Sequence, residues 1–277
     1  MTKFSSALKL LTCCVAVPAL AENPDKSQFN LFNPVPEGQL REIIGDRPDR
    51  TESPTTVDAG HIQIEASFAD FAHDKSGGTE FSAITAGATN LRIGLLSDLE
   101  LQVLFDVWTR EEIGVRGLPE EVTEGFSDIT LRPKLNIWGN DGGSTALAIM
   151  PAVKIPTGSK LSVEEIEGSI IVPFGMDLTE RFGLGLMAEV DWVYDEEDRG
   201  YETEFVHTAV LGYDLNDKIG IYAEYIGVSG SNNYQPYFSG GMTLGVSENA
   251  VFDLGAVVGL NEDANDIQIF TGITVRF

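Results

Sequence analysis

Side chains that commonly carry out catalysis are sparse in this sequence. It has three histidines, His61, His73 and His207, and two cysteines, Cys13 and Cys14. The histidines are too far apart for an H-E-x-x-H zinc site, and no serine stands in a G-x-S-x-G turn. His207 is followed by threonine and alanine, so no serine–histidine pair forms there. We therefore expect no catalytic residue, metal site or cofactor, and we expect His207 to be an interfacial or packed strand residue.

Carboxylates are the abundant ionisable group. The 277 residues include 43 Asp plus Glu against 18 Lys plus Arg, a formal charge of -25. Several lie in runs, such as Glu111-Glu112, Glu120-Glu121 and Asp195-Glu196-Glu197-Asp198. Such runs can bind calcium or bridge to lipopolysaccharide through divalent ions, but no EF-hand loop is present, and solvated loops are the alternative. The negative charge argues against nucleic acid as a partner.

The N-terminus has the pattern of a secretory signal. Lys3 and Lys9 precede an apolar run at residues 10–17, and Ala19-Leu20-Ala21 offers small residues for cleavage. The run is too short for a membrane anchor. We predict that residues 1–21 are a cleaved signal peptide. Its removal takes away both cysteines and two basic residues, so the charge of the mature chain becomes -27.

Residues 22–59 are rich in proline and have no sustained hydrophobic period. The prolines are Pro24, Pro34, Pro36, Pro48 and Pro54. This composition predicts an irregular N-terminal segment without a core of its own.

From residue 60 to the end, apolar and polar residues alternate. In the last stretch, the odd positions from 267 to 277 are Ile, Ile, Thr, Ile, Val and Phe, while the even positions include Gln268 and Arg276. One face suits lipid and the other suits water. About twelve such stretches are expected near residues 60–71, 81–96, 99–109, 126–139, 144–156, 168–178, 182–195, 201–214, 218–229, 234–247, 250–260 and 266–277. The pattern predicts an all-β fold, an antiparallel transmembrane β-barrel over residues 60–277.

The connections alternate in length. Short breaks such as Ser97-Asp98 and Ser247-Glu248-Asn249 alternate with longer ones. The longer ones lie near residues 72–80, 110–125, 157–167, 195–200, 230–233 and 261–265. Short periplasmic turns and longer outer loops are typical of outer-membrane barrels, with both termini in the periplasm. A soluble β-sandwich could match the strand lengths but not this alternation.

Two features resemble known outer-membrane proteins. The terminal Phe277 closes an alternating strand, as does the C-terminal assembly signal of bacterial outer-membrane barrels. Residues 47–65, RPDRTESPTTVDAGHIQIE, resemble a motif of the phenol meta-pathway degradation transporter family, with shorter matches at Gly125-Phe126-Ser127-Asp128 and at residues 151–158. Arg50 departs from the family pattern, which commonly has an aromatic or apolar residue there. The resemblance implies a channel-like outer-membrane transporter for aromatic or other hydrophobic compounds.

The alternation also sorts charges to the inner face. It predicts a basic wall on one side of the lumen and an acidic wall on the other, which would set a transverse field. The basic wall is Arg92, Arg110, Arg132, Lys134 and Lys154; the acidic wall is Glu189, Asp191, Glu204, Asp214, Glu224 and Asp253. The alternative is that these charges form interstrand salt bridges that fill a narrow lumen.

The N-terminal segment presents a similar choice. Residues 22–59 could enter the barrel as a plug, with Arg47, Asp49 and Glu52 paired to lumen charges. Otherwise they form a periplasmic tail.

These patterns predict an outer-membrane channel for passive passage of small molecules, and the family resemblance implies aromatic or hydrophobic molecules among them. The expected partners are outer-membrane lipid, lipopolysaccharide, the barrel-assembly machinery and a small-molecule solute. One alternative is a structural or adhesive barrel with a closed lumen and acidic ligand- or cation-binding loops. Another is a soluble periplasmic β-protein.

Overall fold

The structure is a computed structural model that describes residues 25–163, 165–195, 198–231 and 233–277. The predicted signal peptide, residues 1–21, lies outside these residues. One 3₁₀ helix, η1 (Glu37–Gln39), precedes thirteen β-strands. The strands are β1 (Ile62–Ser76), β2 (Thr79–Gly94), β3 (Leu99–Val115), β4 (Glu121–Gly125), β5 (Ile129–Trp138), β6 (Thr145–Ile155), β7 (Glu167–Asp177), β8 (Phe182–Asp195), β9 (Gly200–Asn216), β10 (Ile219–Ser229), β11 (Tyr234–Ser247), β12 (Ala250–Gly259) and β13 (Ile267–Arg276).

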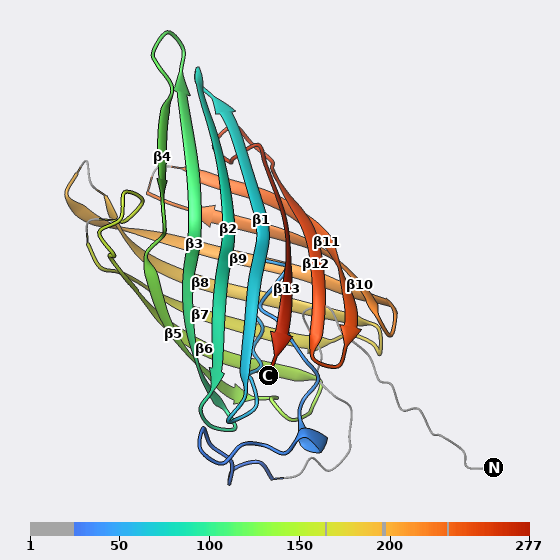
Figure 1. Cartoon of the computed structure of the whole chain (residues 1–277). Coiled ribbons are helices and arrows are strands. Elements are labelled where there is room, and N and C mark those ends of the chain that lie inside the picture. The colour runs from blue at the N-terminus through green and yellow to red at the C-terminus, as the bar shows by residue number, and fades with distance from the viewer. Residues whose placement is uncertain (1–24, 164, 196–197, 232) are drawn as a thin grey trace.

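Twelve of these strands close into a barrel (Figure 1). Each pairs antiparallel with the strands next to it in the chain. The exception is β3, which pairs with β5 through residues 99–104 and with the short strand β4 through residues 109–113. The first and last strands close the ring, from Gln63 opposite Arg276 to His73 opposite Ile267. Closure leaves no long unpaired sheet edge within the ring, so backbone hydrogen bonds are satisfied without water. The predicted antiparallel barrel of about twelve strands is confirmed.

Two of the six longer connections are shorter than predicted, and the other four lie close to the predicted ranges. The predicted loop at residues 72–80 is mostly strand, because β1 and β2 continue to a tight turn at Gly77 and Gly78. Most of residues 110–125 is also strand: β3 runs to Val115 and β4 pairs back on it. Long hairpins therefore project beyond the rest of the barrel (Figure 1). The sequence did not predict strand in these stretches because charged residues interrupt the apolar alternation. Charged side chains are tolerated there because the strands extend into water.

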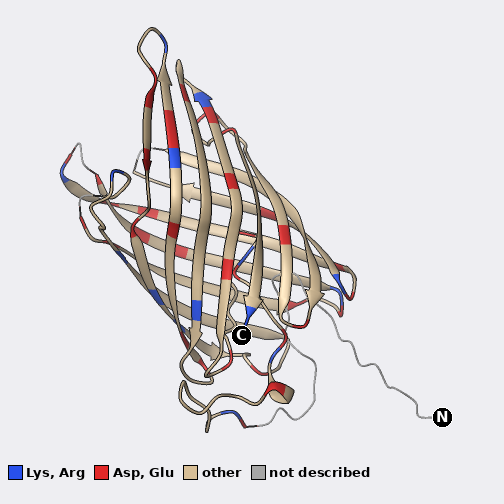
Figure 2. Ribbon diagram, viewed as in Figure 1, with Lys and Arg blue, Asp and Glu red and all other residues tan. Residues whose placement is uncertain are grey.

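The two faces of the barrel wall differ in chemistry. Inward residues such as Gln63, Arg92 and Glu224 are buried, whereas outward residues such as Leu254 and Ile269 are exposed. A soluble protein has the opposite distribution, so the outer surface requires lipid. Acidic residues gather in the projecting part of β3 and β4 (Figure 2). No helix in the described ranges is long and apolar enough to cross a membrane.

Arg110 lies on the outer face, so its predicted place in the lumen is wrong. Asp70 accepts a hydrogen bond from Gln268 on the inner face, and it pairs with Thr85, which in turn pairs with Thr109. Directly opposed residues share a face, so Thr109 points inward and Arg110 outward. The alternation changes because β2 is irregular at Gly87 (φ 71°) and β1 has a register shift after Ser67. An irregularity of one residue reverses the faces beyond it.

The N-terminal segment runs beneath the barrel and into its lumen (Figure 1, blue). Phe29, Val35 and Ala59 pack into a small apolar core at the barrel end where β2 turns into β3. The approach is close: a Cβ added at Gly60, whose φ is 81°, would lie 2.5 Å from the Cβ of Pro34. A side chain at Gly60 would therefore displace the segment from the barrel end.

We predict that Leu254→Arg lowers the free energy of unfolding in lipid vesicles by about 2–4 kcal/mol, because it places a cation on the lipid-facing side of β12. Val122→Arg is the matched control, because Val122 is similarly exposed but lies in the projecting strand β4. The control should cost no more than about 1 kcal/mol. Urea titration of vesicle-inserted protein measures both variants, and equal losses would contradict this assignment of the membrane-facing surface.

Candidate functional site

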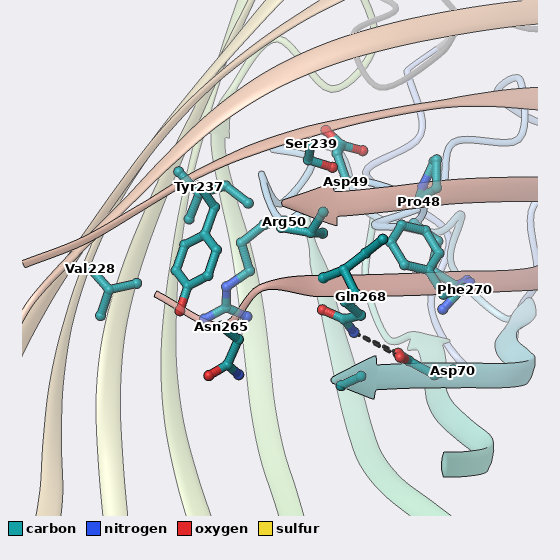
Figure 3. Close-up of a pocket in the computed structure, with 15 residues that line it drawn as sticks. Pro48, Asp49, Arg50, Asp70, Val228, Tyr237, Ser239, Asn265, Gln268 and Phe270 are labelled. Atoms are coloured by element: carbon teal, nitrogen blue, oxygen red, sulfur yellow. Dashed lines mark hydrogen bonds between the residues drawn. The ribbon is translucent and has the colours of Figure 1, made fainter. Parts of the chain in front are cut away.

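A cavity of about 350 Å³ lies in the lumen beside residues 47–50 of the N-terminal segment (Figure 3). Its opposite walls come from β1 and β10–β13. The polar lining includes Asp49, Arg50 and Gln268, and the last donates to Asp70 at 2.8 and 2.9 Å. The apolar lining includes Ile226, Val228, Val257, Ile267 and the Phe270 ring. The cavity can therefore surround a small solute with both apolar and hydrogen-bonding groups.

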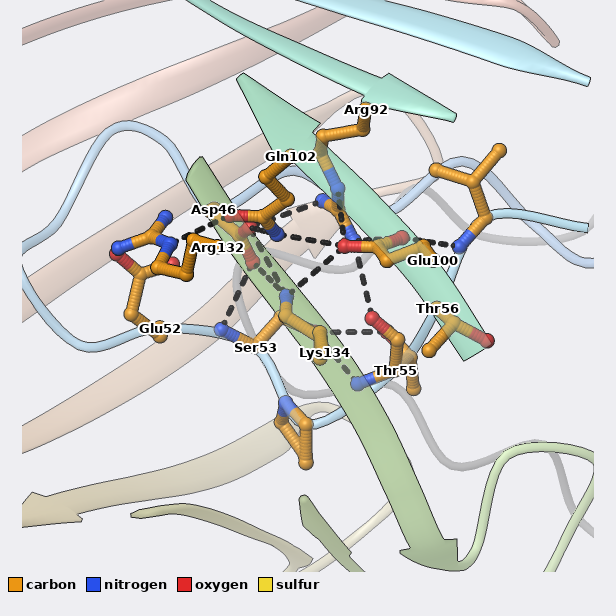
Figure 4. A network of polar contacts seen from close by, with 12 residues as sticks. Asp46, Glu52, Ser53, Thr55, Thr56, Arg92, Glu100, Gln102, Arg132 and Lys134 are labelled. Carbon is orange, nitrogen blue, oxygen red and sulfur yellow. Dashed lines mark hydrogen bonds and ion pairs between the residues drawn. The ribbon is translucent and has the colours of Figure 1, made fainter. Parts of the chain in front are cut away.

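Asp46 of the segment is the centre of a buried charge network (Figure 4). Its carboxylate accepts from Lys134 Nζ at 2.7 and 2.9 Å and from Gln102 Nε2 at 2.7 Å, and lies 3.4 Å from Arg92 Nη1. Burial alone would raise the pKa of Asp46, but the charges of Arg92 and Lys134 outweigh it and hold the pKa well below its usual range. Asp46 is therefore ionised, and it bridges β2, β3 and β5.

Arg92 joins the segment to the barrel wall at several points. Its guanidinium donates to Glu65 at 2.8 Å and to Glu100 at 2.9 Å. It also donates to the carbonyls of Thr55 at 3.0 Å and Ile44 at 3.1 Å. Because Arg92 is almost completely buried, these acceptors replace the water that a charged guanidinium would otherwise require.

Glu52 forms the next contact along the segment. Its Oε1 accepts from Arg132 Nη1 at 2.6 Å, and Arg132 Nε donates to Gln102 at 2.7 Å. Glu52 Oε2 is buried and has no hydrogen-bond partner among the described residues. Burial therefore dominates and raises the pKa of Glu52 to about 7, although Arg132 opposes the shift.

The segment also contacts the opposite wall. Arg47 donates to both carboxylate oxygens of Asp253, at 2.7 and 3.1 Å, and Arg50 Nη2 donates to Glu189 at 2.9 Å. Glu224 accepts from the backbone nitrogens of Arg50 at 3.0 Å and Thr51 at 2.8 Å. Residues 46–52 thus reach from β3 and β5 on one side of the lumen to β10 and β12 on the other.

A second set of contacts holds the segment at the barrel end. Arg41 donates to both oxygens of Asp141, in the turn between β5 and β6, at 2.8 Å. Lys26 Nζ lies 2.8 Å from Asp58 and 3.2 Å from Asp141. The segment is therefore fixed both at its base and within the lumen.

The five residues of the predicted basic wall do not lie together on one side of an open lumen. Arg92, Arg132 and Lys134 are buried against the segment. Lys154 is partly exposed and pairs with Glu167 at 2.8 Å. Arg110 lies outside the lumen, where it pairs with Glu112 and Glu124. Each of these basic residues forms an ion pair with an acidic residue. They therefore do not line an open lumen as a wall of unpaired positive charge.

The predicted acidic residues fall into two groups. Glu189, Glu224 and Asp253 contact Arg50, Thr51 and Arg47 of the segment, as given above. Asp191 lies opposite Glu204 on the neighbouring strand, and both are partly exposed, whereas Asp214 is buried. Only the first group therefore binds the segment through hydrogen bonds described above.

The other predicted residues are placed as follows. Asp49 is buried and lines the cavity. Phe277 is exposed, and its backbone nitrogen donates to the Ile62 carbonyl at 2.8 Å, which adds one residue to the closure of β1 and β13. His207 stacks on Phe205 and lies 3.2 Å from the Tyr234 hydroxyl.

Several important residues were not identified from the sequence. Asp46, Arg41 and Asp58 lie in a segment without periodicity, so no pattern indicated their direction. Glu65 and Glu100 could have been predicted as lumen residues, because each lies at an inward-facing position in the alternation of its strand. An apolar cluster of Met150, Ile171, Met187 and Val206, with Val228 packed against it, also lies on β6–β10 and was not predicted from the sequence.

We predict that Asp46→Asn loosens the segment. The substitution keeps the side-chain shape but removes the buried charge, and removing one partner of a buried ion pair typically costs about 3–5 kcal/mol. Protease digestion of the folded protein should then cut residues 25–59 faster than in the wild type. Asp25→Asn, at an exposed position of the same segment, is the control. Equal digestion of all three proteins would show that the network does not hold the segment.

We also predict that Glu52 makes segment binding depend on pH. Its pKa is about 7 in the seated segment and would be near its ordinary value of 4.5 when released into water. Between these two pKa values Glu52 is protonated in the seated segment and ionised in the released one. Proton binding therefore stabilises the seated segment; this stabilisation is fully present below pH 4.5 and is lost as pH rises through 7. The change is at most about 3 kcal/mol.

Protease protection measured from pH 4 to 8 tests this effect. Protection should fall as pH rises through the window, and Glu52→Gln should flatten that part of the curve. Glu37→Gln, which alters an exposed carboxyl of η1, is the matched control. An unchanged curve for Glu52→Gln would exclude Glu52 as the titrating group.

Comparison with solved structures shows which proteins share this fold. An outer membrane channel from Pseudomonas putida F1 matches with a TM-score of 0.60 and 13% identity, covering 84% of this chain and 100% of that one. The NanC porin matches with a TM-score of 0.50 and 8% identity, covering 77% and 98%. The translocator domain of the autotransporter NalP from Neisseria meningitidis matches with a TM-score of 0.50 and 11% identity, covering 78% and 89%. All three share the architecture of bacterial outer-membrane barrels.

Comparison of sequences is more specific. No curated protein matches the chain significantly. A family model described as "Putative MetA-pathway of phenol degradation" matches residues 45–277, which include the lumen part of the segment and the whole barrel. The chain belongs to this phenol-degradation family, and its fold is that of bacterial outer-membrane β-barrels.

Proposed function

We propose that this protein is an outer-membrane channel for the passive passage of small molecules. The observation that carries the proposal is the cavity between the N-terminal segment and β10–β13. The segment fills the lumen beside β2, β3 and β5, where Arg92 and Lys134 bind it, but leaves space on the opposite side. Diffusion through this space is the mechanism we propose.

The lining favours solutes that are small and partly hydrophobic. Phe270 and the aliphatic residues present an apolar surface, while Gln268, Asn265 and Tyr237 offer hydrogen-bonding groups. The family description refers to phenol degradation, and the similar Pseudomonas structure is described as an outer membrane channel. Together these support aromatic or other hydrophobic compounds as the substrate class.

A buried apolar cluster of β6–β10 backs one wall of the cavity. Val228 belongs to both features, because it packs against the cluster of Met150, Ile171, Met187 and Val206 and also lines the cavity. The cluster therefore supports the wall beside Val228, and the apolar lining of the cavity itself is what would lower the cost of moving a hydrophobic solute through a polar lumen. Residues 47–50 would then form the constriction.

Delivery to the outer membrane would use both ends of the chain. Residues 1–21 would direct export and be cleaved, and Phe277 at the end of β13 would be read by the barrel-assembly machinery. The expected contacts in the membrane are lipid and lipopolysaccharide, the latter beside the projecting charged hairpins.

Conductance in a planar bilayer tests the channel. We expect discrete steps from the wild type and larger steps from Arg47→Ala, since this substitution removes the two hydrogen bonds to Asp253 and a side chain from the constriction. Arg181→Ala, in an exposed turn, is the control and should match the wild type. A sealed bilayer after verified insertion of both the wild type and Arg47→Ala would instead support a structural barrel with a closed lumen.

A further inference from the structure

An apolar hairpin protrudes from the N-terminal segment at the end of the barrel. Asn30 and Asn33 pair through backbone hydrogen bonds of 3.0 and 2.9 Å, which places Leu31 and Phe32 at the tip. Phe32 is 93% exposed and Leu31 is 38% exposed. Phe29, by contrast, turns into the small core with Val35. Two large apolar side chains are thus held outward on a supported turn.

The backbone of this hairpin needs no water at its donors. The nitrogens of Phe29, Leu31 and Phe32 donate to Lys26 O, Leu95 O and Asn30 Oδ1 at 3.0, 2.9 and 3.0 Å. The nitrogens of Asn30 and Asn33 are used in the hairpin itself, and Asn33 Nδ2 donates to Gln28 O at 3.1 Å. Entry of backbone into an apolar or interfacial medium is costly mainly when polar groups lack partners, and here the donors have them.

The hairpin is attached to the barrel rim. Leu31 binds the backbone of Leu95, in the turn between β2 and β3, and the adjacent Leu96 is 45% exposed. Ile62 and Phe277, at the same end of the neighbouring strands β1 and β13, are also exposed. The apolar tip is therefore continuous with the lower edge of the lipid-facing surface.

The local charge is also informative. Residues 27–36 contain no charged side chain, although the chain as a whole is strongly acidic. A protein partner recognised in water would leave two exposed apolar side chains in solvent whenever it is absent, whereas lipid is always present at the rim.

We propose that the hairpin Asn30–Asn33 is a membrane anchor that inserts Leu31 and Phe32 into the inner-leaflet interface of the outer membrane. The anchor holds the base of the N-terminal segment against the rim, independently of the ion pairs between Arg41 and Asp141. It keeps the segment attached to the barrel when its lumen part is displaced.

Spin labelling tests the anchor in the full-length protein in vesicles. The background carries Cys13→Ser and Cys14→Ser, and a nitroxide is attached at Phe32→Cys. Gly38→Cys, exposed on η1 of the same segment, is the aqueous control, and Leu254→Cys is the lipid control. At position 32 we expect a ratio of oxygen to nickel-chelate collisions several-fold above that at position 38 and below that at position 254, because an interfacial side chain lies less deep than one on the lipid-facing side of β12.

A ratio at position 32 equal to that at position 38 would overturn the proposal. Low collision rates with both reagents would also overturn it, because they would show cover by protein, either a second copy or another part of the chain. A second measurement retains an aromatic side chain: Phe32→Trp is made after Trp108, Trp138 and Trp192 are changed to Phe. Its fluorescence should be quenched by lipids brominated near the headgroup, and absence of quenching would contradict insertion.

Discussion

Charges buried in the lumen must be neutralised inside the barrel, and this constraint governs the rest of the structure. Lys134 and Arg92 are buried away from water. An unpaired charge in such a position would cost several kcal/mol. With Arg132 there are three buried cations on this side, and the strands supply only Glu65 and Glu100, so Asp46 of the N-terminal segment is the third carboxylate. The segment and the barrel wall are therefore electrostatically complementary, and neither is adequately neutralised on that side without the other.

The same complementarity explains why the lumen is filled unevenly. Carboxylates of the segment lie towards the basic side chains of β2 and β5, and arginines of the segment lie towards Glu189 and Asp253. The segment crosses between these walls and leaves its free volume beside β10–β13. The proposed route is thus set by where ion pairs hold the polypeptide, and the proposed anchor at Phe32 would fix the point from which the segment enters.

The sequence predicted the barrel because lipid imposes a strict alternation on each strand. The last stretch, residues 266–277, shows this, and β13 occupies Ile267–Arg276 as the pattern required. The same alternation correctly directed Arg92, Arg132 and Lys134 inward. It failed for Arg110, because the irregularity near Gly87 reverses the phase and leaves no sign in the hydrophobic pattern. It also missed the strands around residues 110–125, where water on both sides removes the need for an apolar face.

The sequence by itself determined the irregular segment, the alternating strands and the family motif at residues 47–65, because each depends on neighbours close in the chain. Only the tertiary structure decided which charges meet. Arg47 pairs with Asp253 and Asp46 with Lys134, across 206 and 88 residues, respectively. No local sequence pattern predicts pairs so far apart in the chain, because the pairings arise from the closure of the barrel and the path of the segment through it. The cavity is a consequence of those pairings, so it could not be predicted before them.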